Sequence, residues 1–91
     1  MRIRKLLRRA LSGPQNFSFR DMITLVEAFG FRLDRVNGSH HIFSHAKLTE
    51  LVNIQDAGGQ AKPYQIRQFL KLVEQHDLAL IDDEAEAAEE Q

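Results

Sequence analysis

Cysteine is absent from this chain of 91 residues, and its absence removes several kinds of chemistry. Disulfide bonds, thiolate metal sites and thiol nucleophiles are all excluded. A chain without cysteine also fits the reducing cytoplasm, and we expect that location. No pair of acidic residues stands at metal-ligand spacing and no glycine-rich nucleotide loop is present, so we expect neither a metal nor a cofactor.

Long hydrophobic runs are also missing. No apolar stretch approaches the roughly 18–20 residues needed to cross a bilayer, so we expect no membrane partner. Residues 1–10 are basic, but no secretory apolar core follows them, which argues against a signal peptide. A short amphipathic targeting stretch is the alternative for this segment.

The net charge of −1 hides a strong asymmetry along the chain. Residues 1–76 carry all 12 Lys and Arg with six acids, whereas residues 77–91 carry seven acids and no base. A basic body suits a polyanionic partner such as nucleic acid. The acidic end is typical of a solubilising tail, and the alternative is a tail that competes with nucleic acid for the basic face.

Apolar residues recur at helical spacing in three segments, residues 2–11, 18–29 and 63–76. Ser18 is placed to cap the second of these helices with its hydroxyl. Gly30 fits the left-handed position just after the last turn of the same helix. The spacing therefore predicts a short basic helix followed by two longer amphipathic ones.

Three short strands are predicted between the last two helices, over residues 31–36, 40–44 and 50–55. The first strand alternates apolar and polar residues, which is the pattern of a half-buried strand. Asn37 and Gly38 both tolerate positive φ, so they predict the hairpin turn between the first two strands.

The order helix–strand–strand–strand–helix predicts an α+β fold. We expect a three-stranded antiparallel sheet with two helices on one face, plus the short N-terminal helix. This layout is like that of the double-stranded-RNA-binding domain, and it leaves the other sheet face open to a partner. We divide the chain into a basic extension outside the core (1–16), the domain itself (17–79) and an acidic tail expected to be disordered (80–91).

The segment Gly38-Ser39-His40-His41 is the strongest candidate for chemistry. Imidazole titrates near neutrality and can act as a general base, while backbone N–H groups of a tight turn, with the Ser39 hydroxyl, can hold a phosphate. Neighbouring residues on a strand point to opposite faces, so only one of the two histidines lies on the open face. The pattern leaves open which one, and each alone is also consistent with an ordinary surface or core imidazole.

Four basic residues are candidates for contacts to phosphate. Arg35 and Lys47 flank the predicted hairpin, Lys62 opens the last helix, and Arg67 follows one turn later. Each alone is consistent with a solvated charge. Together they predict a phosphate-contacting rim.

Residues 25–33, 35–45 and 61–70 carry a resemblance to a known family. In order and spacing they resemble the HicA family, the small toxin ribonucleases of HicA–HicB toxin–antitoxin pairs. The resemblance covers residues 18–78, and its most specific part is the glycine–serine–histidine turn that starts at Gly38.

The resemblance implies the toxin endoribonuclease of a type II toxin–antitoxin pair, which cleaves mRNA without a metal in a stress response. It implies that a histidine after the turn is catalytic; we prefer His40, with His41 as runner-up, since members differ in which position carries it. It further implies that Lys62 or Arg35, with backbone N–H groups near Gly38, stabilises the charged phosphoryl group. Finally, it implies a HicB-like antitoxin protein that covers the active face.

The chain departs from the family pattern after the third strand. Members commonly carry a proline and a histidine there, whereas this chain has Asn53, Ile54, Gln55 and Asp56. That departure favours an alternative, a non-catalytic RNA-binding or antitoxin-binding module of the same fold. A structural adaptor that docks a larger partner through residues 1–16 is a third hypothesis.

Overall fold

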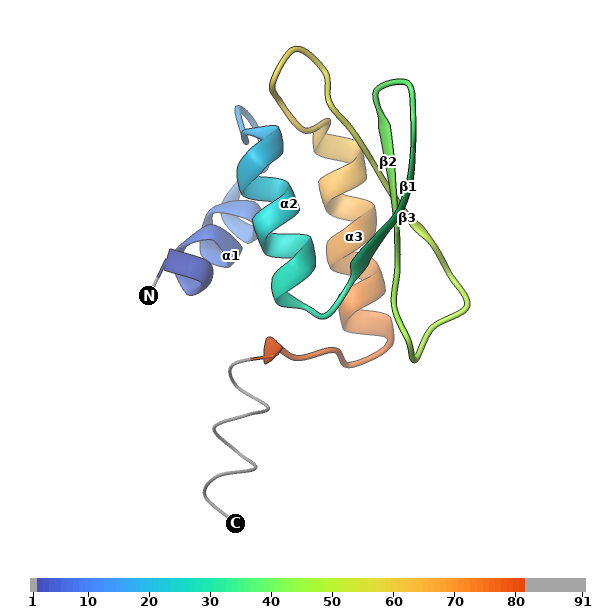
Figure 1. Cartoon of the computed structure of the whole chain (residues 1–91). Helices are drawn as coiled ribbons and strands as arrows, with labels where there is room; N and C mark the ends of the chain where they lie inside the picture. The colour runs from blue at the N-terminus through green and yellow to red at the C-terminus, as the bar shows by residue number, and fades with distance from the viewer. Residues whose placement is uncertain (1, 82–91) are drawn as a thin grey trace.

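The computed structural model describes residues 2–81, which form three helices and a three-stranded antiparallel sheet (Figure 1). Strand β2 lies between β1 and β3. The elements in chain order are α1 (Arg2–Ser12), α2 (Phe19–Ala28), β1 (Arg32–Asn37), β2 (His40–Ser44), β3 (Val52–Gln55) and α3 (Pro63–Gln75). The predicted α+β fold is therefore confirmed.

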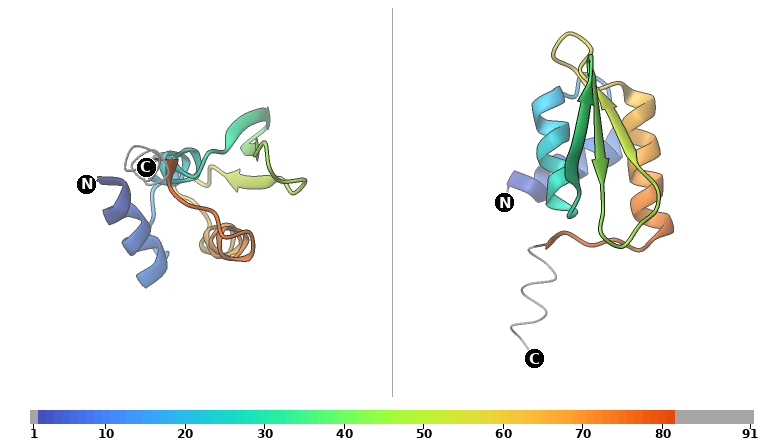
Figure 2. Two further views of the ribbon diagram at one scale, coloured as in Figure 1. Left: turned by 90° about the horizontal axis from the view of Figure 1, so that it is seen from below. Right: turned by 45° about the vertical axis from the view of Figure 1, so that its right-hand side comes forward.

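The molecule has three layers. Helices α2 and α3 cover one face of the sheet, and α1 lies on the side of those helices away from the sheet (Figures 1 and 2). The opposite face of the sheet is left without a covering helix within the described residues. This arrangement has the open sheet face that the sequence predicted.

Local capping explains where α2 begins and ends. The Ser18 hydroxyl accepts a hydrogen bond from the backbone N–H of Asp21 at 3.0 Å, which satisfies one of the unpaired donors of the first turn. After the helix, Gly30 adopts a φ of +94°, and a Cβ there would lie 3.1 Å from His45 Nε2. Both signals had been read from the sequence, and both are confirmed.

The hairpin turn is displaced by one residue from its predicted position. Asn37 pairs with His40 as the last residue of β1, so the two loop residues are Gly38 and Ser39. Gly38 has a φ of +63°, whereas Asn37 and Ser39 do not have positive φ. A type II′ turn has a positive φ only at its first central residue, where glycine is typical, whereas a type I′ turn needs positive φ at both. Gly38 and Ser39 therefore fit a type II′ turn.

A bulge in β1 changes which of its residues share a face. The pairing steps from Leu33 opposite Phe43 to Arg35 opposite Ile42, so Asp34 is the extra residue. Leu33 therefore lies on the helix-covered face with Phe43, and Arg35 lies on the open face. Regular alternation, as predicted for residues 31–36, would place Leu33 and Arg35 on one face, so that prediction fails at the bulge.

All six residues of β1 are exposed, which corrects the prediction of a half-buried strand. The physical reason is that β1 is an edge strand that helices α2 and α3 cover poorly (Figure 2). Leu33 and Val36 are each about half exposed, at 49% and 52%. The edge thus presents apolar side chains and unpaired backbone groups.

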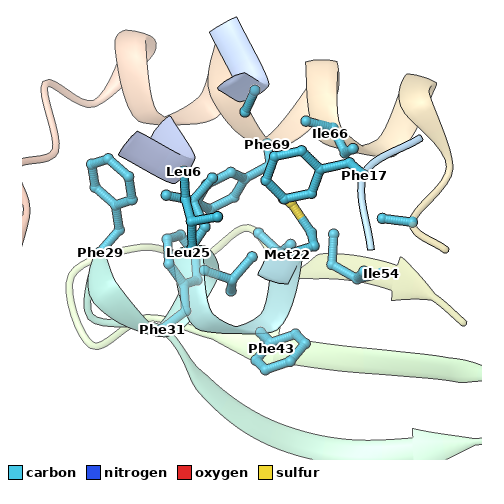
Figure 3. Close-up of a cluster of buried hydrophobic side chains, with 14 of the residues drawn as sticks. Leu6, Phe17, Met22, Leu25, Phe29, Phe31, Phe43, Ile54, Ile66 and Phe69 are labelled. Atoms are coloured by element: carbon cyan, nitrogen blue, oxygen red, sulfur yellow. The ribbon is translucent and has the colours of Figure 1, made fainter. Parts of the chain in front are cut away.

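The core lies between the helices and the sheet, and α1 contributes to it (Figure 3). Phenylalanines from four segments fill its centre, and Leu6 and Ala10 of α1 are 4% and 1% exposed. The expectation that residues 1–16 lie outside the core is therefore wrong for these two side chains. Leu80, assigned from the sequence to the tail, is also buried, whereas residues 82–91 lie outside the described residues.

Candidate active site

The β1–β2 turn, the loop before α3 and the start of α2 meet at one end of the molecule (Figure 1). Backbone hydrogen bonds join them. The Asp56 N–H donates to the Ser39 carbonyl at 2.9 Å, and the Phe19 N–H donates to the Gly59 carbonyl at 2.9 Å. Three segments that are distant in sequence therefore hold the histidine pair in place.

His40 lies on the open face of the sheet, which no helix covers within residues 2–81. It pairs with Gln55 in the register of β2 and β3, and its Nδ1 lies 3.1 Å from Oδ1 of Asn53 on the same face. An amide oxygen only accepts, so Nδ1 of His40 donates. The neutral ring then presents Nε2 as the nitrogen that can take up a proton.

His41 faces the helix side. It pairs with the buried Ile54, and its ring makes an edge contact with Phe19 at a centroid distance of 4.7 Å. Its Nδ1 lies 3.2 Å from the backbone oxygen of Ser39, so this nitrogen also donates. The hydrogen bond holds the His41 ring against its own turn, and the ring contact holds it against the start of α2. His41 therefore has a structural role in packing.

The turn itself has an open outer surface. Apart from Gly38 and its two chain neighbours, no atom of the described residues lies within 4 Å of the position where a Cβ on Gly38 would stand. The carbonyl of Ser39 is occupied from the inner side, because it accepts from the Asp56 N–H. Gly38 is exposed and Ser39 is half-buried, so the outer side of the turn is open to solvent.

Arg35 is the basic residue that the bulge places on the face of His40. It stands opposite Ile42, which shares that face with His40. Its guanidinium pairs with the adjacent Asp34, and both side chains are about half exposed. The open face therefore combines an imidazole with a nearby cation.

Lys62 immediately precedes α3, at the same end of the molecule as the turn, and its side chain is half-buried. The N-terminus of α3 is tied to the sheet by Gln65, which is 4% exposed. Oε1 of Gln65 accepts from the Gln55 N–H at 2.8 Å, and Gln55 is the residue paired with His40. Gln65 thus fixes α3 against the end of β3.

Two predicted phosphate contacts are not brought to this end. Lys47 lies in the turn after β2, at the far end of that strand from Gly38. Arg67 lines a groove between α1 and α3, with Leu7 and Leu70, on the side away from the sheet. A single rim that includes both residues and the hairpin turn does not form.

Sequence reasoning missed Asn53 and Gln65. Asn53 was noted only as part of a departure from the family pattern, and nothing local shows that it contacts a residue 13 positions away. Gln65 did leave a signal. It stands one turn before the buried Phe69, so it is a polar residue within an apolar helical stripe.

The remaining two histidines have structural partners. The Lys47 N–H donates to Nδ1 of His45 at 3.1 Å, and this ring packs edge-on against Phe31. Nε2 of His76 lies 2.7 Å from a carboxylate oxygen of Glu50, and this hydrogen bond holds the pKa of Glu50 below its usual value of 4.5. Within residues 2–81, no three His, Cys, Asp or Glu side chains group closely enough to hold a metal ion.

The described residues therefore form a small α+β domain that carries an imidazole on the open face of its sheet, beside a glycine–serine turn. The family model for the HicA toxin of bacterial toxin–antitoxin systems matches residues 19–74, which span α2 to α3. The chain therefore belongs to the HicA toxin family. Helix α1 lies outside the matched residues.

Comparison with curated proteins and with solved structures finds no match. None of the helices described here has the length and apolar character needed to span a membrane. The family, together with the site geometry, is thus the basis on which function is inferred.

Proposed function

We propose that this member of the HicA toxin family is an endoribonuclease that cleaves mRNA without a metal ion and uses His40 as its general base. The observation that carries the proposal is the position of His40. Its ring lies on the open face of the sheet, and Asn53 holds Nδ1 as a donor. Nε2 is then available as the proton acceptor.

The reaction needs one proton acceptor beside a ribose. Nε2 of His40 takes the proton of the 2′-hydroxyl, and the 2′-oxygen attacks the adjacent phosphorus. The bond from phosphorus to the 5′-oxygen breaks, and this oxygen takes a proton from water. The products are a 2′,3′-cyclic phosphate and a free 5′-hydroxyl. Because a single imidazole supplies only the base, we expect a slow enzyme.

Charge develops on the phosphoryl oxygens during this step and needs donors. The outer side of the turn at Gly38 and Ser39 offers backbone N–H groups, and Arg35 offers a guanidinium on the face of His40. Lys62 supplies a further cation at the same end of the molecule. Lys47 lies at the far end of β2, and Arg67 lines the groove beside α1, so both are better suited to more distant phosphates of the RNA.

The two histidines give different expectations under substitution. A purified chain, a His40→Ala variant and a His41→Ala variant are incubated with long single-stranded RNA in EDTA. Loss of a general base typically costs about 10²–10⁴ in rate, so His40→Ala should reduce cleavage by that factor. His41→Ala should act through packing against Phe19, with lower thermal stability and cleavage retained at low temperature.

Asn53→Ala is the matched test of the orienting contact. It removes the partner of Nδ1 while leaving the His40 ring in place, so cleavage should fall by less than in His40→Ala. Cyclic-phosphate ends on the fragments identify the chemistry. If His41→Ala abolishes cleavage in a folded protein while His40→Ala does not, the assignment of the base to His40 is wrong.

A non-catalytic module that binds RNA or an antitoxin is the second candidate. The exposed edge strand β1 favours it, because Leu33 and Val36 present apolar surface suited to a protein partner. A HicB-like antitoxin is the partner we propose for this edge. Intact RNA with every variant, together with partner binding that survives loss of both His40 and His41, would support the module over the enzyme.

A further inference from the structure

Helix α1 presents a strongly basic outer surface that the proposed catalytic step does not use. Its five cations are Arg2, Arg4, Lys5, Arg8 and Arg9, and the helix contains no acid. Leu6 and Ala10 point into the core, so Lys5, Arg8 and Arg9, spaced three and four residues apart, share the outward face. We call Lys5, Arg8 and Arg9 the α1 basic face.

Like charges at this spacing repel one another within a helix. Arg9 is partly compensated, because its guanidinium lies 3.5 Å from Asp21 and its Cζ lies 4.9 Å above the Phe17 ring. Lys5 and Arg8 are exposed to solvent. The α1 basic face therefore gains from any polyanion that lies along it.

The described chain ends beside this helix. Leu80 is 6% exposed, and Leu80 and Ile81 line one hollow with Ile3 of α1. Residues 82–91 continue from that point with six acids and no base. The acidic segment thus begins directly after Ile81, and Ile81 lies next to the first turn of the basic helix α1.

Length and charge both suit an intramolecular contact. An extended segment of this length reaches at most about 33–36 Å, whereas α1 is about 16 Å long. We propose that residues 82–91 occupy the α1 basic face at low ionic strength, and that RNA phosphates must displace them to bind there. The contact itself is independent of the proposed function, whereas its effect on RNA rests on RNA binding.

A spin label tests the contact without RNA. The chain has no cysteine, so Ala87→Cys gives a single attachment site for a nitroxide. At about 20 mM salt, amide signals of Lys5, Arg8 and Arg9 should broaden, and the broadening should largely vanish at about 1 M salt, where the screening length falls to about 3 Å.

The matched control carries the same label with all six acids of residues 82–91 changed to Asn or Gln. If the label approaches α1 only because the tail is attached nearby, the amide signals broaden equally in the native and the neutralised protein. That result would overturn the proposal. Stronger broadening in the acidic chain supports it.

An RNA measurement tests the competition. In a His40→Ala background, which prevents cleavage, the affinity for poly(U) is measured with the native and the neutralised tail. Neutralisation should tighten binding about tenfold at low salt, as expected when two or three exposed ion pairs no longer have to be broken. Replacing the two solvent-exposed cations by Lys5→Gln and Arg8→Gln should remove most of that gain.

If neutralising the tail still increases the affinity for poly(U) in the Lys5→Gln/Arg8→Gln variant, the tail acts on another surface and the proposal is wrong. Equal broadening in the spin-label experiment would overturn the contact directly. If the tail affects RNA binding as expected but the wild-type protein does not cleave RNA, the proposed function is wrong and the contact stands. The two failures are therefore distinguishable.

Discussion

Replacement of Leu6 by alanine should destabilise the protein strongly, because α1 is part of the core. Leu6 is 4% exposed and packs within the same cluster as Leu25 and Phe69. Buried leucine-to-alanine changes cost about 2–5 kcal/mol, and a helix near the chain terminus relaxes into part of the cavity, so we expect about 2–3 kcal/mol. For a domain of this size, that corresponds to a fall in melting temperature of about 10–20 °C.

The same helix supplies a matched control. Leu11 is 65% exposed, so Leu11→Ala makes the same chemical change outside the core and should alter stability by less than about 0.5 kcal/mol. Thermal and urea unfolding, followed by circular dichroism, measure both variants. Equal and small effects for Leu6→Ala and Leu11→Ala would refute the reasoning, since α1 would then be a separable extension as the sequence had suggested.

Two further predictions concern the ends of the elements. Glu50→Gln removes the carboxylate that is paired with His76. Because folding lowers the pKa of Glu50, the stability contributed by this pair is present above about pH 4.5 and is lost as the pH falls through the lowered pKa. The melting temperatures of the variant and the wild type should therefore converge in acid. Curves that stay equally far apart below that pH would contradict this sign. Gly30→Ala places a Cβ on a residue with a φ of +94°, at 3.1 Å from Nε2 of His45, so it should cost about 1 kcal/mol or more by chemical denaturation. Gly13→Ala is the control: apart from the chain neighbours, no described atom lies within 4 Å of the new Cβ, so its effect should be nearly neutral.

The order and type of the elements could be predicted because each leaves a local signal. Ser18 and Gly30 mark the ends of α2, and the spacing of apolar residues marks all three helices. The faces of β1 could not be predicted, because the bulge at Asp34 is a property of pairing between two strands. Simple alternation fails after one extra residue, and it fails for Leu33 and Val36 in particular.

The prediction that α1 lies outside the core was wrong for a related reason. A basic helix with one apolar stripe is consistent with a free extension, a membrane-surface helix or a helix packed on a domain. Only the opposing surface decides, and here it is provided by α2 and α3, which accommodate Leu6 and Ala10. The local sequence of α1 contains no information on that surface.

The site shows the same division between local and distant information. The segment from Gly38 to His41 predicted a turn with two imidazoles, but the partner of His40 is Asn53 on the neighbouring strand. Sequence position alone predicts one rim that includes Lys47 and Arg67. The fold separates them because Lys47 follows β2 at the end of the strand far from Gly38, whereas Arg67 lines the groove between α1 and α3.

The departure from the family pattern after the third strand now has a location. Asn53 contacts the ring of His40, and Gln55 pairs with His40 across the sheet, so the altered stretch forms one side of the candidate site. An amide at position 53 orients an imidazole without adding charge, whereas a carboxylate there would favour the imidazolium and leave less of the neutral imidazole at a given pH. Asn53→Asp should therefore shift the pH profile of cleavage to higher pH if His40 is the base, and should leave it unchanged if His41 is. Because Asn53 lies on the open face and His41 on the covered one, this single substitution separates the two histidines without removing either.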